Sequence, residues 1–297
     1  MMSYGATWPN SAAQPRSWRQ AAESQHETAR ATLRATIQRA KKSGSPPTPE
    51  VVTAFAAVHM TTANGRPIVA APHHWLWLRL MCDPFIRRLL IIGTPESAKT
   101  TWALAYAACL IGFYPERPGI IAASSGSVAA KRSLALRNLV ASAEFKLTFP
   151  DVLPAAGMPW REDEWSVAPG GVAHDGRLHP TVSAYGTGGS ITGSRAAWLI
   201  GDDILDFDNT RTQGARNTTD TWLHKSLLSR SEARTGRVII IGNAWHHDDS
   251  HARLRQNPEW TSCHIPLLSD GPEVYATITY PDDYAGWPIG KPQGLAL

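Results

Sequence analysis

A lysine and a threonine in succession, Lys99 and Thr100, stand where an apolar run gives way to a helical pattern. The run at residues 89–92 predicts a buried strand, and helix-forming residues begin at position 99. A tight loop between a strand and a helix can bind phosphate groups, because backbone N–H groups and the positive helix end point into it. There a lysine reaches the terminal phosphates of ATP, and a threonine hydroxyl ligates Mg²⁺. The residues predicted to contact the nucleotide are Gly93, Thr94, Pro95, Glu96, Ser97, Ala98, Lys99, Thr100 and Thr101.

One position departs from the phosphate-loop pattern G-x-x-x-x-G-K-T. Ala98 stands where glycine is usual. Because alanine carries a Cβ, we expect the site to work only if residue 98 has a negative φ and its methyl group clears the phosphates. Pro95 fixes φ within the loop and stiffens it. The alternative is an ordinary turn between a strand and a helix with a chance Lys-Thr pair.

Two further apolar runs end in polar side chains. Residues 196–201 lead into Asp202 and Asp203, and residues 238–242 lead into Asn243. Paired carboxylates downstream of a phosphate loop suit hydrolysis of Mg-ATP: Asp202 would hold Mg²⁺ through water, and Asp203 would orient and deprotonate the attacking water. The amide of Asn243 could hydrogen-bond the γ-phosphate or this water and so report which is present. An ordinary Asp-Asp turn after a strand is the alternative.

Aromatic residues precede the first of these strands. In many ATPases this segment holds the adenine by stacking and by polar contacts with its edge. His73, His74 and Trp75 are the candidates here, and His74 is the predicted nucleotide contact. Packing of aromatic side chains against a helix is the favoured explanation of the segment as a whole.

A second histidine-rich segment, residues 246–249, has the sequence His-His-Asp-Asp and superficially resembles a set of metal ligands. Adjacent histidines rarely share one ion without a distant third ligand. We therefore do not expect a metal site there.

Strand and helix patterns alternate along the chain. Successive strand–helix–strand units force a mostly parallel sheet. We therefore predict an α/β fold of the P-loop NTPase (ASCE) type, a central sheet flanked by helices, with an N-terminal helical arm. The helices are expected at residues 17–42, 49–60 with Thr48 as cap, from 99 onward and 128–141; the strands at 89–92, 120–125, 198–203, 238–243 and 264–268; and a short hairpin at 165–172.

Composition and charge narrow the function classes. The 297 residues suffice for a full-sized core, and no window approaches the length of apolar residues that a membrane span needs, so we expect a soluble, intracellular protein. The three cysteines are far apart, which suggests neither a disulfide framework nor a zinc site. Residues 1–50 carry seven basic and three acidic side chains, which accounts for the whole net charge of +4. Such a basic arm either follows nucleic-acid phosphates or is a solvated helix.

The motifs together resemble a known family. The runs ITGSRAAWLIGDDILD, TWLHKSLLSR and GRVIIIGNAWHHDDSHARL, after the loop GTPESAKT, are similar to the large terminase subunits of tailed bacteriophages, the ATP-driven motors that package viral DNA. The resemblance covers roughly residues 70–270. It implies that Lys99 and Thr100 act in the phosphate loop, Asp202 as the Mg²⁺ carboxylate and Asp203 as the catalytic carboxylate. Residues 242–244 would couple hydrolysis to domain movement.

This sequence departs from the family in two respects. Many members have an arginine inside the phosphate loop, whereas this loop has none, and Asn243 stands where a hydroxyl residue is more usual. An arginine finger must then come from elsewhere, either within the chain or from a neighbouring subunit. The candidates are Arg132, Arg137, Arg195 and Arg230.

The resemblance also implies partners and a domain organisation. The partners would be double-stranded DNA, a portal protein and a small terminase subunit, in a homo-oligomeric ring in the host cytoplasm, although the isolated domain could be a monomer. We expect a basic arm at residues 1–47, an ATPase domain at 48–272 and a linker at 273–297 toward a nuclease domain. Only 29 residues follow Leu268, so nuclease activity is not expected of this chain. The alternatives are a helicase-like DNA-stimulated ATPase and a nucleotide-dependent assembly module with little turnover.

Overall fold

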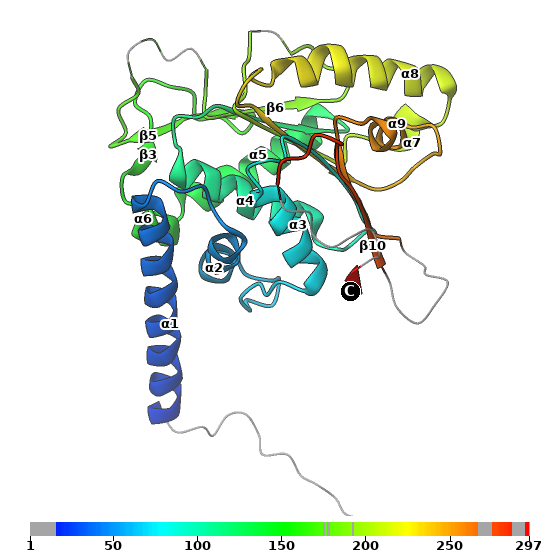
Figure 1. The fold of residues 1–297 in the computed structure, drawn as a ribbon. Helices are drawn as coiled ribbons and strands as arrows, with labels where there is room; N and C mark the ends of the chain where they lie inside the picture. The colour runs from blue at the N-terminus through cyan, green and yellow to red at the C-terminus, as the bar shows by residue number, and fades with distance from the viewer. Residues whose placement is uncertain are drawn as a thin grey trace, which may run out of the picture.

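A nine-stranded sheet forms the centre of the protein (Figure 1). The computed structural model describes residues 16–174, 176, 179–191, 193–266, 275–286 and 295–296. Six neighbouring strands, from β9 to β6 in the order below, run parallel, and the outer strands are antiparallel. This confirms the predicted α/β class. The order is β11 (Leu295–Ala296), β10 (Tyr275–Thr279), β9 (Thr261–His264), β1 (Arg88–Ile92), β8 (Arg237–Gly242), β7 (Trp198–Asp202), β2 (Gly119–Ala123), β6 (Val182–Gly186) and β4 (Glu164–Trp165).

Helices cover both faces of this sheet (Figure 1). Side chains of β1 alternate between two cores: Leu89 and Ile91 face one, and Leu90 and Ile92 face the other. Helices α1 to α6 contribute to the first core, and α8, α9 and the π-helical turn after α8 contribute to the second. The helices are α1 (Arg16–Lys42), α2 (Pro49–His59), α3 (Pro72–Cys82), α4 (Lys99–Phe113), α5 (Gly126–Ala141), α6 (Ala143–Thr148), α7 (Phe207–Thr210), α8 (Gln213–Trp222), the π-helical turn Leu223–Leu227, the 3₁₀ turn Leu228–Arg230 and α9 (Ser250–Gln256).

The basic helix α1 packs against the rest of the protein through its C-terminal half. Arg34 forms an ion pair with Glu144 of α6 at 3.0 Å, and Lys41 forms one with Asp151 at 2.9 Å. Two of the positive charges that distinguish the arm are therefore paired with carboxylates. The cap predicted for the next helix is also present, because Thr48 Oγ1 accepts a hydrogen bond from the Val51 N–H.

Two predicted strands differ from those observed. Residues 165–172 do not form a hairpin, because Trp165 lies in β4 beside β6 while β5 (Val167–Pro169) pairs with β3 (Val152–Pro154). The Trp165 side chain is fully buried and its indole N–H donates to Ser133 Oγ at 2.9 Å, which holds β4 against α5.

The strand expected at residues 264–268 begins instead at Thr261 and lies inside the sheet, between β1 and β10. Residues 275–279, expected to be part of a linker, form β10 and cover that edge. Residues 1–15, the first part of the predicted basic arm, lie outside the described residues. None of the helices in the described ranges is long and apolar enough to cross a membrane.

Candidate nucleotide site

The order of the strands brings the predicted polar residues together. Strand β8 lies between β1 and β7, and all three run parallel, so that Ile92 pairs with Gly242 and Asp202 pairs with Ile241. The carboxyl ends of the three strands therefore meet at one edge of the sheet. The phosphate loop follows β1, Asn243 follows β8, and the two carboxylates stand at the end of β7.

Lys99 is buried at the first position of α4, with 6% of its surface exposed. Its ammonium group donates to the carbonyl oxygen of Thr94 at 2.5 Å and to Asn243 Oδ1 at 3.0 Å. Burial lowers the pKa of Lys99, while the charges of Asp203 and Asp202 oppose this shift. The side chain thus lies between the loop and the ends of the two neighbouring strands.

Asp202 is the most buried acid of the site, with 3% of its surface exposed. Its Oδ1 accepts from Thr100 Oγ1 at 2.9 Å, and its Oδ2 accepts from Arg132 Nε of α5 at 2.7 Å. Burial raises the pKa of this carboxyl, and Arg132 and Thr100 act in the opposite direction. A hydroxyl and a carboxylate oxygen are hard ligands of the kind that Mg²⁺ prefers, so this pair fits the cation.

Asp203 and Asn243 extend the site on the other side. Asn243 Nδ2 donates to Asp203 Oδ1 at 3.4 Å, so its amide bridges Lys99 and Asp203. Burial raises the pKa of Asp203, and the negative charge of Asp202 raises it further. A carboxylate with a raised pKa is a better proton acceptor at neutral pH than an ordinary aspartate.

Backbone strain is concentrated at this site. In the part of the chain that the structure describes, the non-glycine residues with positive φ are Glu96, Ala98 and Asp203. The negative φ that we set as a condition for residue 98 is not observed: Ala98 has φ 59° and ψ 23°. This left-handed residue ends the loop and its carbonyl oxygen accepts from the Trp102 N–H, the first bond of α4. Strained residues of this kind persist where the surrounding structure determines them, and they cluster at functional sites.

His74 supports the phosphate loop. Its Nδ1 accepts from the Ala71 N–H at 2.9 Å, and its Nε2 donates to the carbonyl oxygen of Ser97 at 3.0 Å. Its ring centroid lies 5.1 Å from that of Trp102, and burial lowers its pKa to about 4. The structure therefore places His74 among packed aromatic rings, as the helix-packing explanation predicts, with one polar contact to the loop.

The histidine-rich segment 246–249 has structural contacts. Asp249 caps α9 by accepting from the Ala252 N–H, and Asp248 pairs with Arg253 at 3.0 Å. Among the residues that the structure describes, no group of three or more His, Cys, Asp or Glu side chains could hold a metal ion.

Two contacts of the site were not found from the sequence. Arg132, considered only as an arginine finger, binds Asp202; the other candidate on α5, Arg137, donates instead to the Trp160 carbonyl oxygen. The fully buried His251 donates through Nδ1 to the Asn243 carbonyl oxygen at 3.0 Å. Both side chains come from helices whose placement against the sheet no local pattern reveals.

Comparison with known proteins shows similarity to terminase large subunits. No protein-family model matches the chain. Over 154 residues, 52% of the chain, the sequence is 27% identical to the terminase large subunit of Enterobacteria phage T3, and the match covers 25% of that protein. This chain is related to the terminase large subunits. The resemblance inferred from the motifs is thus confirmed. The crystal structure of the HK97 bacteriophage large terminase aligns with 75% of this chain and 45% of its own, at 18% identity and a TM-score of 0.47. The matched segments therefore cover 25% of the length of the phage T3 protein and 45% of the length of the HK97 protein.

Proposed function

We propose that this chain is the ATP-hydrolysing motor domain of a terminase large subunit, which couples hydrolysis of Mg-ATP to translocation of double-stranded DNA into a procapsid. The observation that carries the proposal is the line of contacts from Lys99 through Asn243 to Asp203, next to the pair formed by Thr100 and Asp202. A cation and a hydroxyl at the start of α4, together with two carboxylates at the end of β7, are groups that phosphoryl transfer to water requires.

Each residue has a distinct role in the proposed reaction. The loop N–H groups and Lys99 bind the phosphates, and Thr100 with Asp202 hold Mg²⁺, which when bound neutralises negative charge on the phosphates. Asp203 orients the attacking water and accepts its proton, a role that its raised pKa favours. Asn243 contacts both Lys99 and Asp203, so it is placed to couple phosphate binding to the position of the carboxylate.

Arg132 adds a step to nucleotide binding. Its Nε occupies Asp202 Oδ2 at 2.7 Å, and its own side chain is about one-third exposed. A metal ion held at Asp202 Oδ2 would compete with the guanidinium, and Arg132 would then release that oxygen. Its positive charge would then be available to the phosphates, which is why Arg132 remains our candidate for an arginine acting within the chain.

The wider assembly is proposed from the relationship to terminases. The partners would be double-stranded DNA, a portal protein and a small terminase subunit. Copies of the chain would form a ring around the DNA. Tracking DNA requires contacts with phosphates and no base recognition, so we expect little sequence preference. The division into an arm at 1–47, an ATPase domain at 48–272 and a tail at 273–297 is part of this proposal, with residues 275–279 contributing β10 to the ATPase sheet.

Steady-state ATPase measurements test the proposal, with and without double-stranded DNA. We expect Mg-dependent turnover that Lys99→Ala abolishes and that Asp203→Asn lowers by about 10²-fold or more while ATP binding is retained. The matched control is Asp208→Asn, the same change at a carboxylate with 84% of its side chain exposed on α7. Turnover in Asp203→Asn equal to that of the control would contradict the assignment of the catalytic carboxylate.

One observation favours a second candidate, a nucleotide-dependent assembly module with little turnover. The left-handed Ala98 places a methyl group in the loop where the phosphate-loop pattern has only hydrogen. This candidate predicts that ATP changes self-association strongly while turnover stays negligible in every variant. Analytical ultracentrifugation with and without Mg-ATP, together with the ATPase assay, separates the two.

A further inference from the structure

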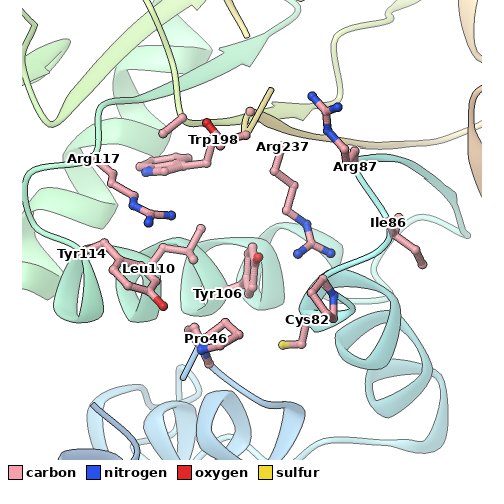
Figure 2. A pocket seen from close by; sticks show the side chains of 15 residues that line it. Pro46, Cys82, Ile86, Arg87, Tyr106, Leu110, Tyr114, Arg117, Trp198 and Arg237 are labelled. Atoms are coloured by element: carbon pink, nitrogen blue, oxygen red, sulfur yellow. The ribbon is translucent and has the colours of Figure 1, made fainter. Parts of the chain in front are cut away.

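A cavity of about 150 Å³ lies at the opposite end of the parallel strands from the nucleotide site (Figure 2). It is lined by the first residues of two strands, Trp198 of β7 and Arg237 of β8, and by the far half of α4. The site at Asp202 and Asn243 lies at the other ends of the same strands, about 15 Å away by the rise of five residues. The cavity is therefore separate from the proposed nucleotide site.

Two guanidinium groups face this cavity from opposite sides (Figure 2). Arg237 donates through Nη2 to the carbonyl oxygens of Leu80 and Asp83, at the end of α3, while its Nε is buried without a partner. The Arg117 guanidinium carbon stacks 4.3 Å from the centre of the Tyr114 ring. Figure 2 shows that Arg87, although part of the lining, is directed away, and it donates to the Ala233 carbonyl oxygen.

The third donor is the indole of Trp198, which is 4% exposed and whose Nε1 has no partner. A glycine keeps the ring in place: an ideal Cβ on Gly119 would lie 2.0 Å from indole Cε2 and Cζ2. Any side chain at residue 119 would push the indole out of this position. The sequence thus keeps a buried indole N–H without a partner in a residue that lines the cavity, on the side of Arg117 (Figure 2).

The charged side chains of the lining all carry positive charge. Arginine and tryptophan side chains are donors only, and none of the 15 lining residues is acidic. Arg237 Nε and Trp198 Nε1 are buried without acceptors, which is costly, whereas the Arg117 side chain is exposed. An anion supplies both charge and acceptor oxygens. The volume is close to that of cavities that hold a single benzene-sized ligand, which limits the occupant to a small molecule or group.

We propose that this cavity binds a small oxyanion, of the size of phosphate or of a single carboxylate group, between Arg117, Arg237 and the indole N–H of Trp198. The apolar part of the wall, which includes Leu110 and Ile86, gives a carboxylate with a short hydrocarbon stem a place as well. The proposal does not depend on ATP hydrolysis, because none of these residues belongs to the nucleotide site.

Isothermal titration calorimetry of the full chain with inorganic phosphate, and separately with acetate, tests the proposal. It also ranks the affinities of the two kinds of oxyanion. Lys99→Ala removes the lysine of the phosphate loop, so anion binding that persists in this variant belongs elsewhere. In the Lys99→Ala background we expect saturable binding of at least one anion. Arg117→Gln in that background should weaken it about tenfold or more, because a hydrogen bond to a charged group is lost.

Two further variants test the indole donor and provide a matched control. Trp198→Phe retains a buried ring but removes the N–H donor, and should weaken binding several-fold with little change in melting temperature. Arg87→Gln is the matched control for Arg117→Gln, because its guanidinium is directed away, and should leave affinity unchanged. The proposal is overturned if Lys99→Ala abolishes all binding, if neither anion binds saturably, or if Arg117→Gln binds as well as Arg87→Gln.

Discussion

Replacing Ala98 by glycine tests whether the left-handed end of the phosphate loop is strained. Ala98 has φ 59° and ψ 23°, a conformation that costs an L-residue about 1–2 kcal/mol. Glycine avoids this cost, but it loses about 0.5–1 kcal/mol more backbone entropy on folding. The difference predicts that Ala98→Gly raises the free energy of unfolding by about 0.5–1 kcal/mol.

Urea unfolding followed by circular dichroism measures this difference, and thermal unfolding should show a rise of about 1–3 °C for a chain of this size. The matched control is Ala130→Gly, the same change inside α5, which should lower the free energy of unfolding by about 1 kcal/mol. The two substitutions therefore have opposite signs. Destabilisation by Ala98→Gly to the same extent as by Ala130→Gly would refute the strain argument. A parallel ATPase measurement shows whether removal of the methyl group also increases turnover.

Three other perturbations have defined outcomes. Gly242→Ala should lower the free energy of unfolding by about 1–3 kcal/mol, measured in urea, because an added Cβ would lie 2.5 Å from His251 Cε1; an unchanged midpoint would contradict this packing. Burial, together with two nearby arginines, lowers the pKa of His59 from 6.5 to about 3. The unfolded chain therefore binds this proton first, so stability should fall as pH is lowered from 6.5 toward 3. His59→Gln should reduce that slope by up to about 1.4 kcal/mol per pH unit, and an identical slope in the variant would rule out this cause. Arg132→Gln should lower the Mg²⁺ concentration needed for ATP binding about tenfold, because it frees Asp202 Oδ2; a higher requirement would mean that Arg132 assists metal binding.

The local parts of the site were predictable from the sequence. Strands β1, β2, β7 and β8 are mostly apolar, and the polar side chains that matter follow directly after such runs, as Asp202 and Asn243 do. In a parallel sheet those positions fall on the same edge. Apolar runs, helix starts and the loop between β1 and α4 depend on residues close in the sequence, and so these elements lie close to where they were expected.

The long-range pairings were not predictable in the same way. No local sequence pattern indicates that β8 lies between β1 and β7. This strand order nevertheless brings Asn243 into contact with both Lys99 and Asp203. Arg132 reaches Asp202 across 70 residues of sequence. The segment 275–279 is rich in threonine and tyrosine, and it forms a strand because β9 offers an unpaired edge.

The left-handed backbone at Asp203 explains how two consecutive carboxylates serve one site. Successive side chains of a strand point to opposite faces of a sheet, so a continued β7 would separate Asp202 from Asp203. A φ of 50° at Asp203 ends the strand, and its N–H bonds to the Ile241 carbonyl oxygen of β8. Asp202 then contacts Thr100 while Asp203 contacts Asn243. Asparagine tolerates this conformation far better than alanine. Asp203→Asn is therefore the substitution that removes the charge and leaves the backbone in place, whereas Asp203→Ala would confound lost chemistry with added strain.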